Sequence, residues 1–337
     1  MATHDSDPWD SGHHIADDYW RSRYYLLAVR GYTLRDHFRP DKQPSQRNPP
    51  RPWPPNDVPD GIDARMPGGK LVLVRRLATD SQELSLLLKF SQPKMRSAPG
   101  NLCVPVLDTF EDPQNTSVTF VVTPFLFDPI QLSWRNVDDI MNYITRILEG
   151  LVFFHANDIS DVLSSTNNVY SVVGFDASSI LEAEGGNWNA VNPLGMLERP
   201  TATFFGNYIY YMRDTVPFYI VHLHYCKVET SVQGPNPSPL PAYRLAEHGN
   251  LPAQDPSSLA ATRMTQGMKS DLRNLNRVVI GEQRGRVVEN PTALGFLQEL
   301  TDELGSSDPP DAVTALRRFR ELHYSRSWLL RKLWPVQ

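Results

Sequence analysis

Cysteine is nearly absent from this chain of 337 residues, which has only Cys103 and Cys226. Two cysteines far apart in sequence exclude a disulfide framework and favour a reducing compartment. The chain also lacks a long apolar run, because its longest apolar segments, such as 120–127, have only the length of a strand. No secretory signal is visible, since the first ten residues are polar and acidic. We therefore expect a soluble protein of the cytoplasm or another intracellular compartment, with no membrane partner.

An excess of positive charge is absent as well. The formal net charge is −5, which argues against a dedicated nucleic-acid-binding protein. Hydrophobic residues make up 40% of the chain and charged residues 21%, close to the average of folded soluble proteins, so wholesale disorder is excluded. The length is sufficient for one large domain or two ordinary ones.

Proline is abundant, with 29 residues, and it is clustered. Eight prolines fall between Pro40 and Pro59, and six between Pro235 and Pro256. Proline removes a backbone donor and restricts the residue before it, so both segments are predicted to be extended or irregular. The run Pro49–Pro55 has the spacing of polyproline II ligands, which predicts docking to a polyproline-binding domain. An arm packed along its own chain is the alternative interpretation.

Periodicity predicts strands and helices in a definite order. The clearest helix is 137–155, where apolar residues recur at spacings of three and four, with Asn136 as N-cap. Gly150 within it predicts close packing against a neighbour. Residues 1–19 are expected to be frayed. The other expected elements are helices at 20–38, 82–90, 294–304 and 312–330, a helix opening at Ser270 or Asp271, and strands at 70–77, 104–110, 117–123, around 169–173 and at 218–224.

Five short strings follow one another along the chain: 63–76 (DARMPGGKLVLVRR), 148–155 (LEGLVFFH), 191–193 (VNP), 216–220 (VPFYI) and 271–275 (DLRNL). In this order they resemble the protein kinase-like family that is abundant in mushroom-forming fungi. The resemblance covers roughly Trp20 to Trp334. It implies an α+β, two-lobed protein kinase-like fold, with a small N-lobe of sheet and helix and a larger, mainly helical C-lobe. The implied domains are an N-terminal extension with the proline-rich arm at 1–66, the N-lobe at 67–126 and the C-lobe at 127–337.

A kinase holds the phosphates of ATP with a glycine-rich flap and with a lysine that a glutamate fixes. No such flap occurs in this sequence. The resemblance puts Arg75 at the lysine position and Thr123 and Phe125 at the hinge, so these residues would contact a nucleotide if one binds. A partly exposed strand arginine is the alternative interpretation of Arg75. The glutamate position aligns with Ser85, and Glu83 lies two residues away on a helix, so we expect the ion pair to be missing.

The catalytic loop of a kinase carries an aspartate followed five residues later by an asparagine. Here the resemblance implies Asp161 as a surviving base and Asn167 as its metal-binding partner, with a one-residue insertion between them. Ordinary loop and turn residues are the alternative. For Asp271 the resemblance implies a structural role, in which its carboxylate accepts backbone N–H bonds from the catalytic loop. A helix N-cap is the simpler interpretation of Asp271.

The magnesium-binding aspartate of a kinase aligns here with His222, which lies near His224. A neutral imidazole does not replace a hard anionic ligand for magnesium, and no third ligand completes a transition-metal site, so we expect no metal. These losses together imply a pseudokinase that acts as a binding or scaffolding module for unidentified protein partners, without a cofactor. The alternative is a weak or unconventional ATP-dependent protein Ser/Thr kinase, which would retain ATP and Mg²⁺.

Overall fold

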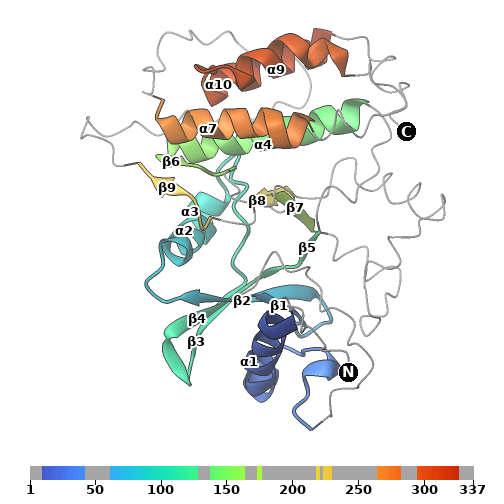
Figure 1. The fold of residues 1–337 in the computed structure, drawn as a ribbon, viewed down its shortest axis with the longest axis vertical. Helices are drawn as coiled ribbons and strands as arrows, with labels where there is room; N and C mark the ends of the chain where they lie inside the picture. Colours follow the sequence, from blue (N-terminus) through green and yellow to red (C-terminus); the bar gives the residue numbers. More distant parts are fainter. Residues whose placement is uncertain are drawn as a thin grey trace, which may run out of the picture. The chain divides into compact units, whose positions relative to one another are not determined.

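The computed structural model describes residues 10–41, 61–127, 137–163, 173–176, 218–220, 223–229, 264–281 and 294–325. These residues form a mixed α+β architecture (Figure 1). They divide into two compact units that are discontinuous in sequence. Of the described residues, the first unit holds 10–41, 61–91, 103–127, 173–176 and 218–220, and the second unit holds the others. Among the described helices, none is both long and apolar enough to cross a membrane.

The first unit is built on an antiparallel sheet of four strands, in the order β1-β2-β4-β3. Its strands are β1 (Gly61–Arg65), β2 (Leu71–Ala78), β3 (Asp108–Asp112) and β4 (Asn115–Pro124). The strands predicted at 70–77 and 117–123 are confirmed, whereas β3 begins four residues later than the start predicted at 104. β1 was not predicted. The boundary expected after residue 66 therefore falls between two paired strands of one sheet.

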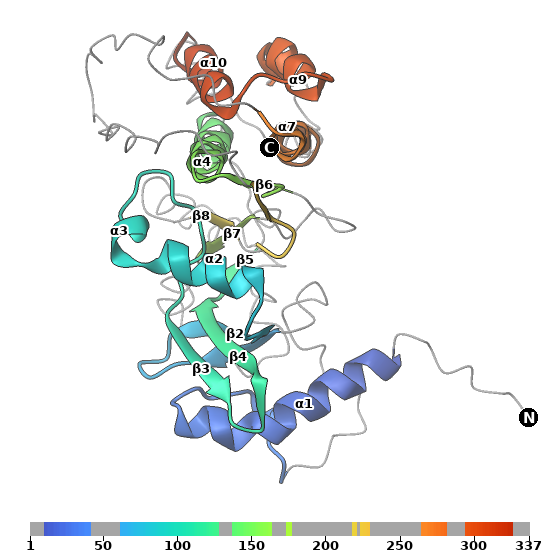
Figure 2. The ribbon, with the colours of Figure 1, turned by 90° about the vertical axis from the view of Figure 1, so that its left-hand side faces the viewer.

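Helix α1 (Asp10–Val29) packs on one face of this sheet, as Figure 2 shows. The prediction of a helix at 20–38 and a frayed start was wrong at both ends. The helix stops before Gly31, which has a φ of +91° that favours glycine, and only the short 3₁₀ turn η1 (Asp36–Phe38) follows. The shared core comprises Trp20, Leu27, Tyr32, Leu34, Phe38, Ile62, Ala64, Val72, Val74, Phe110, Phe120 and Val122. These strand residues alternate along the chain, so they project from the same face.

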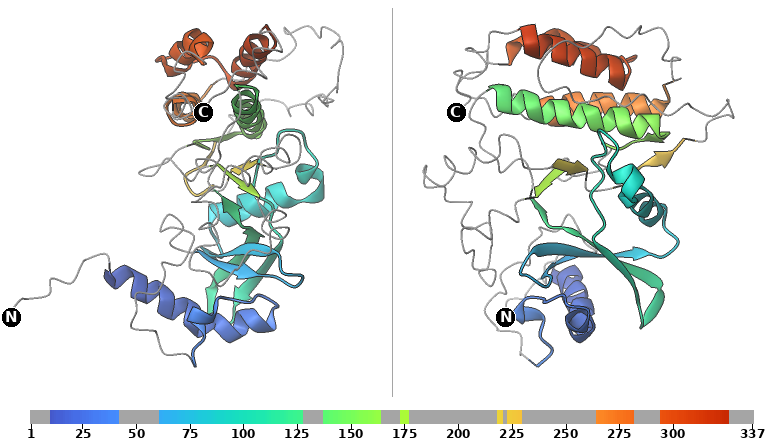
Figure 3. Two further views of the ribbon diagram at one scale, coloured as in Figure 1. Left: turned by 90° about the vertical axis from the view of Figure 1, so that its right-hand side faces the viewer. Right: turned by 180° about the vertical axis from the view of Figure 1, so that it is seen from behind.

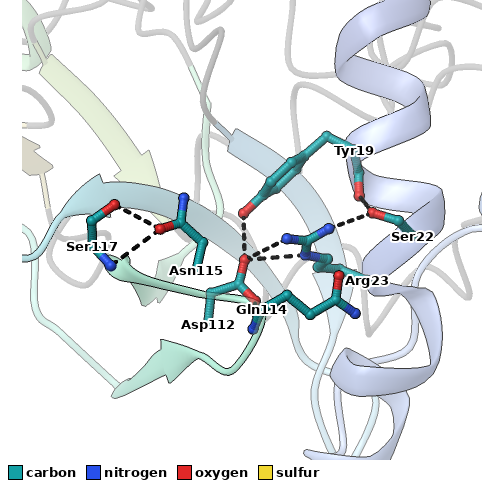
Figure 4. A network of polar contacts seen from close by, with 7 residues as sticks. All are labelled: Tyr19, Ser22, Arg23, Asp112, Gln114, Asn115 and Ser117. Atoms are coloured by element: carbon teal, nitrogen blue, oxygen red, sulfur yellow. Dashed lines mark hydrogen bonds and ion pairs between the residues drawn. The ribbon is translucent and has the colours of Figure 1, made fainter.

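A polar network fastens α1 to the turn between β3 and β4 (Figure 4). Asp112 is fully buried, and its Oδ2 accepts hydrogen bonds from the Tyr19 hydroxyl at 3.1 Å and from Arg23 at 2.9 and 3.1 Å. Its Oδ1 accepts the backbone N–H of Gln114 at 3.0 Å. Burial, together with the charge of Asp112, raises the pKa of Tyr19 to about 12. The carboxylate thus holds both the helix and the turn.

The first unit contains two further structural features. Helix α2 (Gln82–Ser91), predicted at 82–90, follows β2 and buries Leu84, Leu87 and Phe90. A second antiparallel sheet joins β5 (Leu126–Phe127), β7 (Val173–Asp176) and β8 (Phe218–Ile220). The two short strands predicted in these regions exist, although β7 lies later than expected and residues 223–226 are not in a strand.

The second unit is mainly helical, with α4 (Val137–Ala156), α7 (Gln266–Asn274), α9 (Gln298–Gly305) and α10 (Ala312–Ser325) as its longer helices (Figures 1 and 3). The π-helix η5 (Leu275–Ile280), the 3₁₀ turn η6 (Gly295–Leu297) and the short helix α3 (Pro93–Arg96) accompany them. The strands β6 (Ile159–Ser160) and β9 (Lys227–Val228) form a small antiparallel sheet.

Helix α4 confirms the prediction at 137–155. Gly150 packs closely as expected, because a Cβ at this position would lie 2.7 Å from the Leu102 side chain. Helix α7 begins earlier than predicted. Its N-cap is Thr265, whose hydroxyl accepts the N–H of Met268, so the expected start at Ser270 or Asp271 was wrong.

Candidate functional site

Arg75 lies on β2 and forms a buried ion pair with Glu83 of helix α2. Its Nη1 donates to Glu83 Oε1 at 2.9 Å, and the residues are only 5% and 4% exposed. Two expectations are therefore wrong. Arg75 is not a partly exposed strand arginine, and an ion pair between strand and helix is present rather than missing.

The position of Glu83 follows from its place in the first turn of α2. Side chains of a helix point back toward its N-terminus, so a residue in the first turn reaches toward the strand that precedes the helix. Ser85, which aligned with the expected glutamate, is exposed, and its hydroxyl donates to the carbonyl of Ser81. The side chain that pairs with Arg75 therefore lies two residues before the position that aligned with the glutamate.

The sheet face that carries Arg75 also carries a second buried ion pair. Arg35 Nε donates to Oδ2 of the fully buried Asp63 at 2.7 Å. The register Asp63↔Leu73↔Thr123 runs across β1, β2 and β4, so these three residues share a face with Arg75. Thr123 and Phe125 are both buried at the end of β4 and just after it. Their role as nucleotide contacts stays a prediction.

In the second unit, Asp161 follows directly after β6 and contacts a lysine of β9. Its Oδ2 lies 2.7 Å from Nζ of Lys227, and the two strands pair Ser160 with Lys227. Asp161 is buried, whereas the Lys227 side chain is 70% exposed. The hydrogen bond to Asp161 and its charge raise the pKa of Lys227, so the lysine is an ammonium at neutral pH. The carboxylate therefore already has a cationic partner.

The surroundings of Asp161 are tightly built. Its φ is +56°, a left-handed value that only a few per cent of residues other than glycine adopt. The hydroxyls of Ser160 and Thr265 both donate to Oε1 of Glu229, the latter at 2.8 Å. A Cβ on Gly267 would lie 2.3 Å from Ser160 Oγ and 3.1 Å from Asp161 Oδ2, so α7 approaches β6 as closely as a glycine permits.

Asp271 lies within α7 and is fully buried. Its Oδ1 accepts the backbone N–H of Leu163 at 2.7 Å, and its Oδ2 lies 3.0 Å from Nε2 of His155. The interpretation as an N-cap was wrong, and the predicted acceptance of a backbone N–H from the loop after β6 is confirmed. Burial raises the pKa of Asp271, although the contacts with His155 and Leu163 oppose this shift.

Three predictions concern residues outside the described ranges, namely Asn167, His222 and the arm Pro49–Pro55. They stay predictions. Within the described ranges, no three His, Cys, Asp or Glu side chains are grouped so as to hold a metal ion.

The residues expected to hold Mg²⁺ lie only partly within the described ranges, because Asn167 falls outside them. Asp161, the expected base, contacts an ammonium. Magnesium requires oxygen ligands with near-octahedral geometry, and a single carboxylate beside a lysine does not supply them. Arg75 and Asp161 each belong to an ion pair, one in each unit.

No family model matches the sequence, and neither does any curated protein. Among solved structures the chain is similar to the crystal structure of the Rad53 kinase domain and SCD2, with a TM-score of 0.39 and 15% sequence identity. The match covers 76% of this chain and 81% of that chain. So loose a likeness carries no functional argument. The described residues themselves establish a mixed α+β architecture with a four-stranded antiparallel sheet and a mainly helical second unit.

Proposed function

We propose that the chain is a protein kinase-like domain that does not transfer phosphate and that acts as a binding or scaffolding module for protein partners. One observation carries this proposal. The carboxylate of Asp161, the residue expected to act as base, contacts the ammonium of Lys227 at 2.7 Å. A base in this state has a competing partner for the proton or metal that phosphoryl transfer would bring to it.

The kinase-like part of the proposal draws support from the Arg75–Glu83 ion pair. In protein kinases a strand lysine pairs with a glutamate of the following helix, and this pair must be in place for activity. Here an arginine of β2 pairs with Glu83 of α2, which is the next helix along the chain. Arginine binds a carboxylate well, but its planar fork differs from an ammonium in reach and geometry. The ion pair therefore provides a contact between strand and helix like that of a kinase, with an arginine in place of the lysine.

The proposal that the domain does not transfer phosphate draws further support from the spacing of the catalytic-loop residues. Kinases separate the catalytic aspartate from the asparagine by four residues. Counting back from Asn168 with this spacing reaches Leu163, whose N–H is bound by Asp271. In this register no insertion is needed, and an apolar side chain takes the place of the base. Asp161 then lies two residues before that position, so in either register the aspartate nearest to the position of the base is held by Lys227.

Calorimetric titration tests the proposal most directly. ATP is titrated into the full chain with Mg²⁺, with Mn²⁺ and without metal. We expect no heat of binding above the heat of dilution at millimolar ATP, and no rise in melting temperature, because Asp161 already has Lys227 as its cationic partner.

A radiolabelled phosphotransfer assay with generic protein substrates provides the second test. Incorporation that requires ATP and Mg²⁺ and that Asp161→Ala abolishes would establish the alternative function, a weak or unconventional Ser/Thr kinase. Incorporation that Asp161→Ala leaves unchanged points to a contaminating kinase, and a preparation freed of it is expected to incorporate nothing.

A further inference from the structure

The segment 223–229, here called the clasp, is attached to the second unit at three points. Glu229 donates its N–H to the Asp158 carbonyl at 2.7 Å, and β9 pairs with β6. The carboxylate of Glu229 accepts hydrogen bonds from Ser160 and from Thr265, the N-cap of α7. Lys227 contacts Asp161 at 2.7 Å. The clasp thus joins β6 and the start of α7 through side chains of alternating charge.

The backbone at this place is held away from its preferred conformation. Asp158 and Asp161, on either side of β6, have φ values of +59° and +56°. Such conformations cost free energy and persist where surrounding contacts determine them, and they concentrate at functional sites and switch regions. The contacts that hold this turn include those of the clasp, because Glu229 bonds Asp158 and Lys227 bonds Asp161.

A buried carboxylate without a counter-charge is expensive, so Asp161 requires a cation. In an active phosphotransferase the comparable carboxylates face a metal ion or a substrate hydroxyl. Here the cation comes from the same chain, on an exposed side chain that can leave without disturbing the core. The raised pKa of Lys227 keeps it charged throughout the physiological range.

We propose that Lys227 is a tethered counter-ion that holds the clasp closed over Asp161, and that it withholds this carboxylate from external cations and hydroxyl groups. This inference rests on the proposed function and deepens it, since it names the contact that keeps the expected base of the kinase-like domain occupied. Removing the charge of Lys227 opens the clasp. The backbone amide of Glu229 is then the first to lose its protection against hydrogen exchange.

Hydrogen-exchange mass spectrometry of the full chain tests the clasp without nucleotide. In Lys227→Met, peptides that cover 223–229 should exchange at least about fivefold faster than in the wild type, because local opening sets the exchange rate. The matched control is Lys269→Met, which breaks an exposed ion pair with Asp308 in the same unit. It should leave exchange in the clasp unchanged. Equal exchange in Lys227→Met and wild type would overturn the proposal.

Two further variants separate charge from shape. Lys227→Arg keeps the charge and should exchange like the wild type; exchange as fast as in Lys227→Met would refute a counter-ion role. In the background Asp161→Asn, Lys227→Met should have no further effect, and an undiminished effect would mean that the two residues are not coupled. None of these measurements depends on ATP, so a failed clasp is distinguishable from a failed pseudokinase proposal.

Discussion

Replacing Glu83 by alanine should strongly destabilise the first unit. The substitution leaves the Arg75 guanidinium in the interior without the carboxylate that now lies 2.9 Å from it. The two side chains are 7% and 3% exposed, so water does not take the place of the lost partner. Breaking a buried ion pair at one end typically costs about 3–5 kcal/mol.

The structure explains the size of this effect. Two unit charges 2.9 Å apart attract by about 6 kcal/mol at an effective dielectric constant of about 20. The desolvation of both groups opposes this attraction in the intact protein, so the net contribution of the pair is small. In Glu83→Ala the attraction is lost while the desolvation of Arg75 remains. The loss of unfolding free energy in Glu83→Ala is therefore much larger than the net contribution of the ion pair to stability.

Urea denaturation followed by circular dichroism measures the free energy of unfolding of each variant. The double variant Arg75→Met, Glu83→Leu removes both charges and should recover most of the loss, within about 1 kcal/mol of the wild type. Arg317→Ala is the control, because its pair with Glu321 is exposed and worth roughly 0.5 kcal/mol. A loss below about 1 kcal/mol in Glu83→Ala, or no recovery in the double variant, would refute the reasoning.

Three further predictions concern stability and ionisation. Asp271→Ala should lower the free energy of unfolding by about 1–3 kcal/mol, because it leaves the buried Leu163 N–H without an acceptor. Asp271→Asn should cost less, and equal losses in the two variants would contradict this reasoning. Gly100→Ala should cost about 1–3 kcal/mol, since its φ is +77° and a Cβ would lie 2.6 Å from the Glu149 carbonyl oxygen, whereas Gly295→Ala, in open space, should be neutral in the same denaturation assay. The spectrophotometric difference between wild type and Tyr19→Phe should show Tyr19 ionising near pH 12. Because the fold favours its neutral form, stability falls as the pH rises from about 10 to 12, and ionisation near 10 would argue against the Asp112 contact.

The sequence predicts best where one periodic pattern is long. Helix α4 agrees with its prediction within a residue at its end, because eight or more apolar positions at helical spacing leave no competing interpretation. Strand β2 was predicted for a similar reason. β1 was missed because Asp63 interrupts its apolar character, and its buried partner Arg35 helps to explain how a carboxylate is accommodated there.

The candidate site was predictable in its residues but not in its pairings. Arg75 and Asp161 were singled out, yet the partner of each lies elsewhere in the sequence, at Glu83 and Lys227. A shift of two positions in a helix decides whether a glutamate reaches the strand, and alignment to a family pattern does not resolve such a shift. The contact of Lys227 depends on the pairing of two-residue strands, which carry almost no periodic signal.

The packing of α1 has a practical consequence for recombinant work. Because the helix covers one face of the four-stranded sheet, a shortened protein that starts at β1 would leave Phe120, Val122 and Val74 open to water. An uncovered apolar surface of this kind attracts hydrophobic dyes and other copies of itself. Expression should therefore include the chain from Asp10 onward, and dye binding by a truncated form would report how much apolar surface this one helix covers.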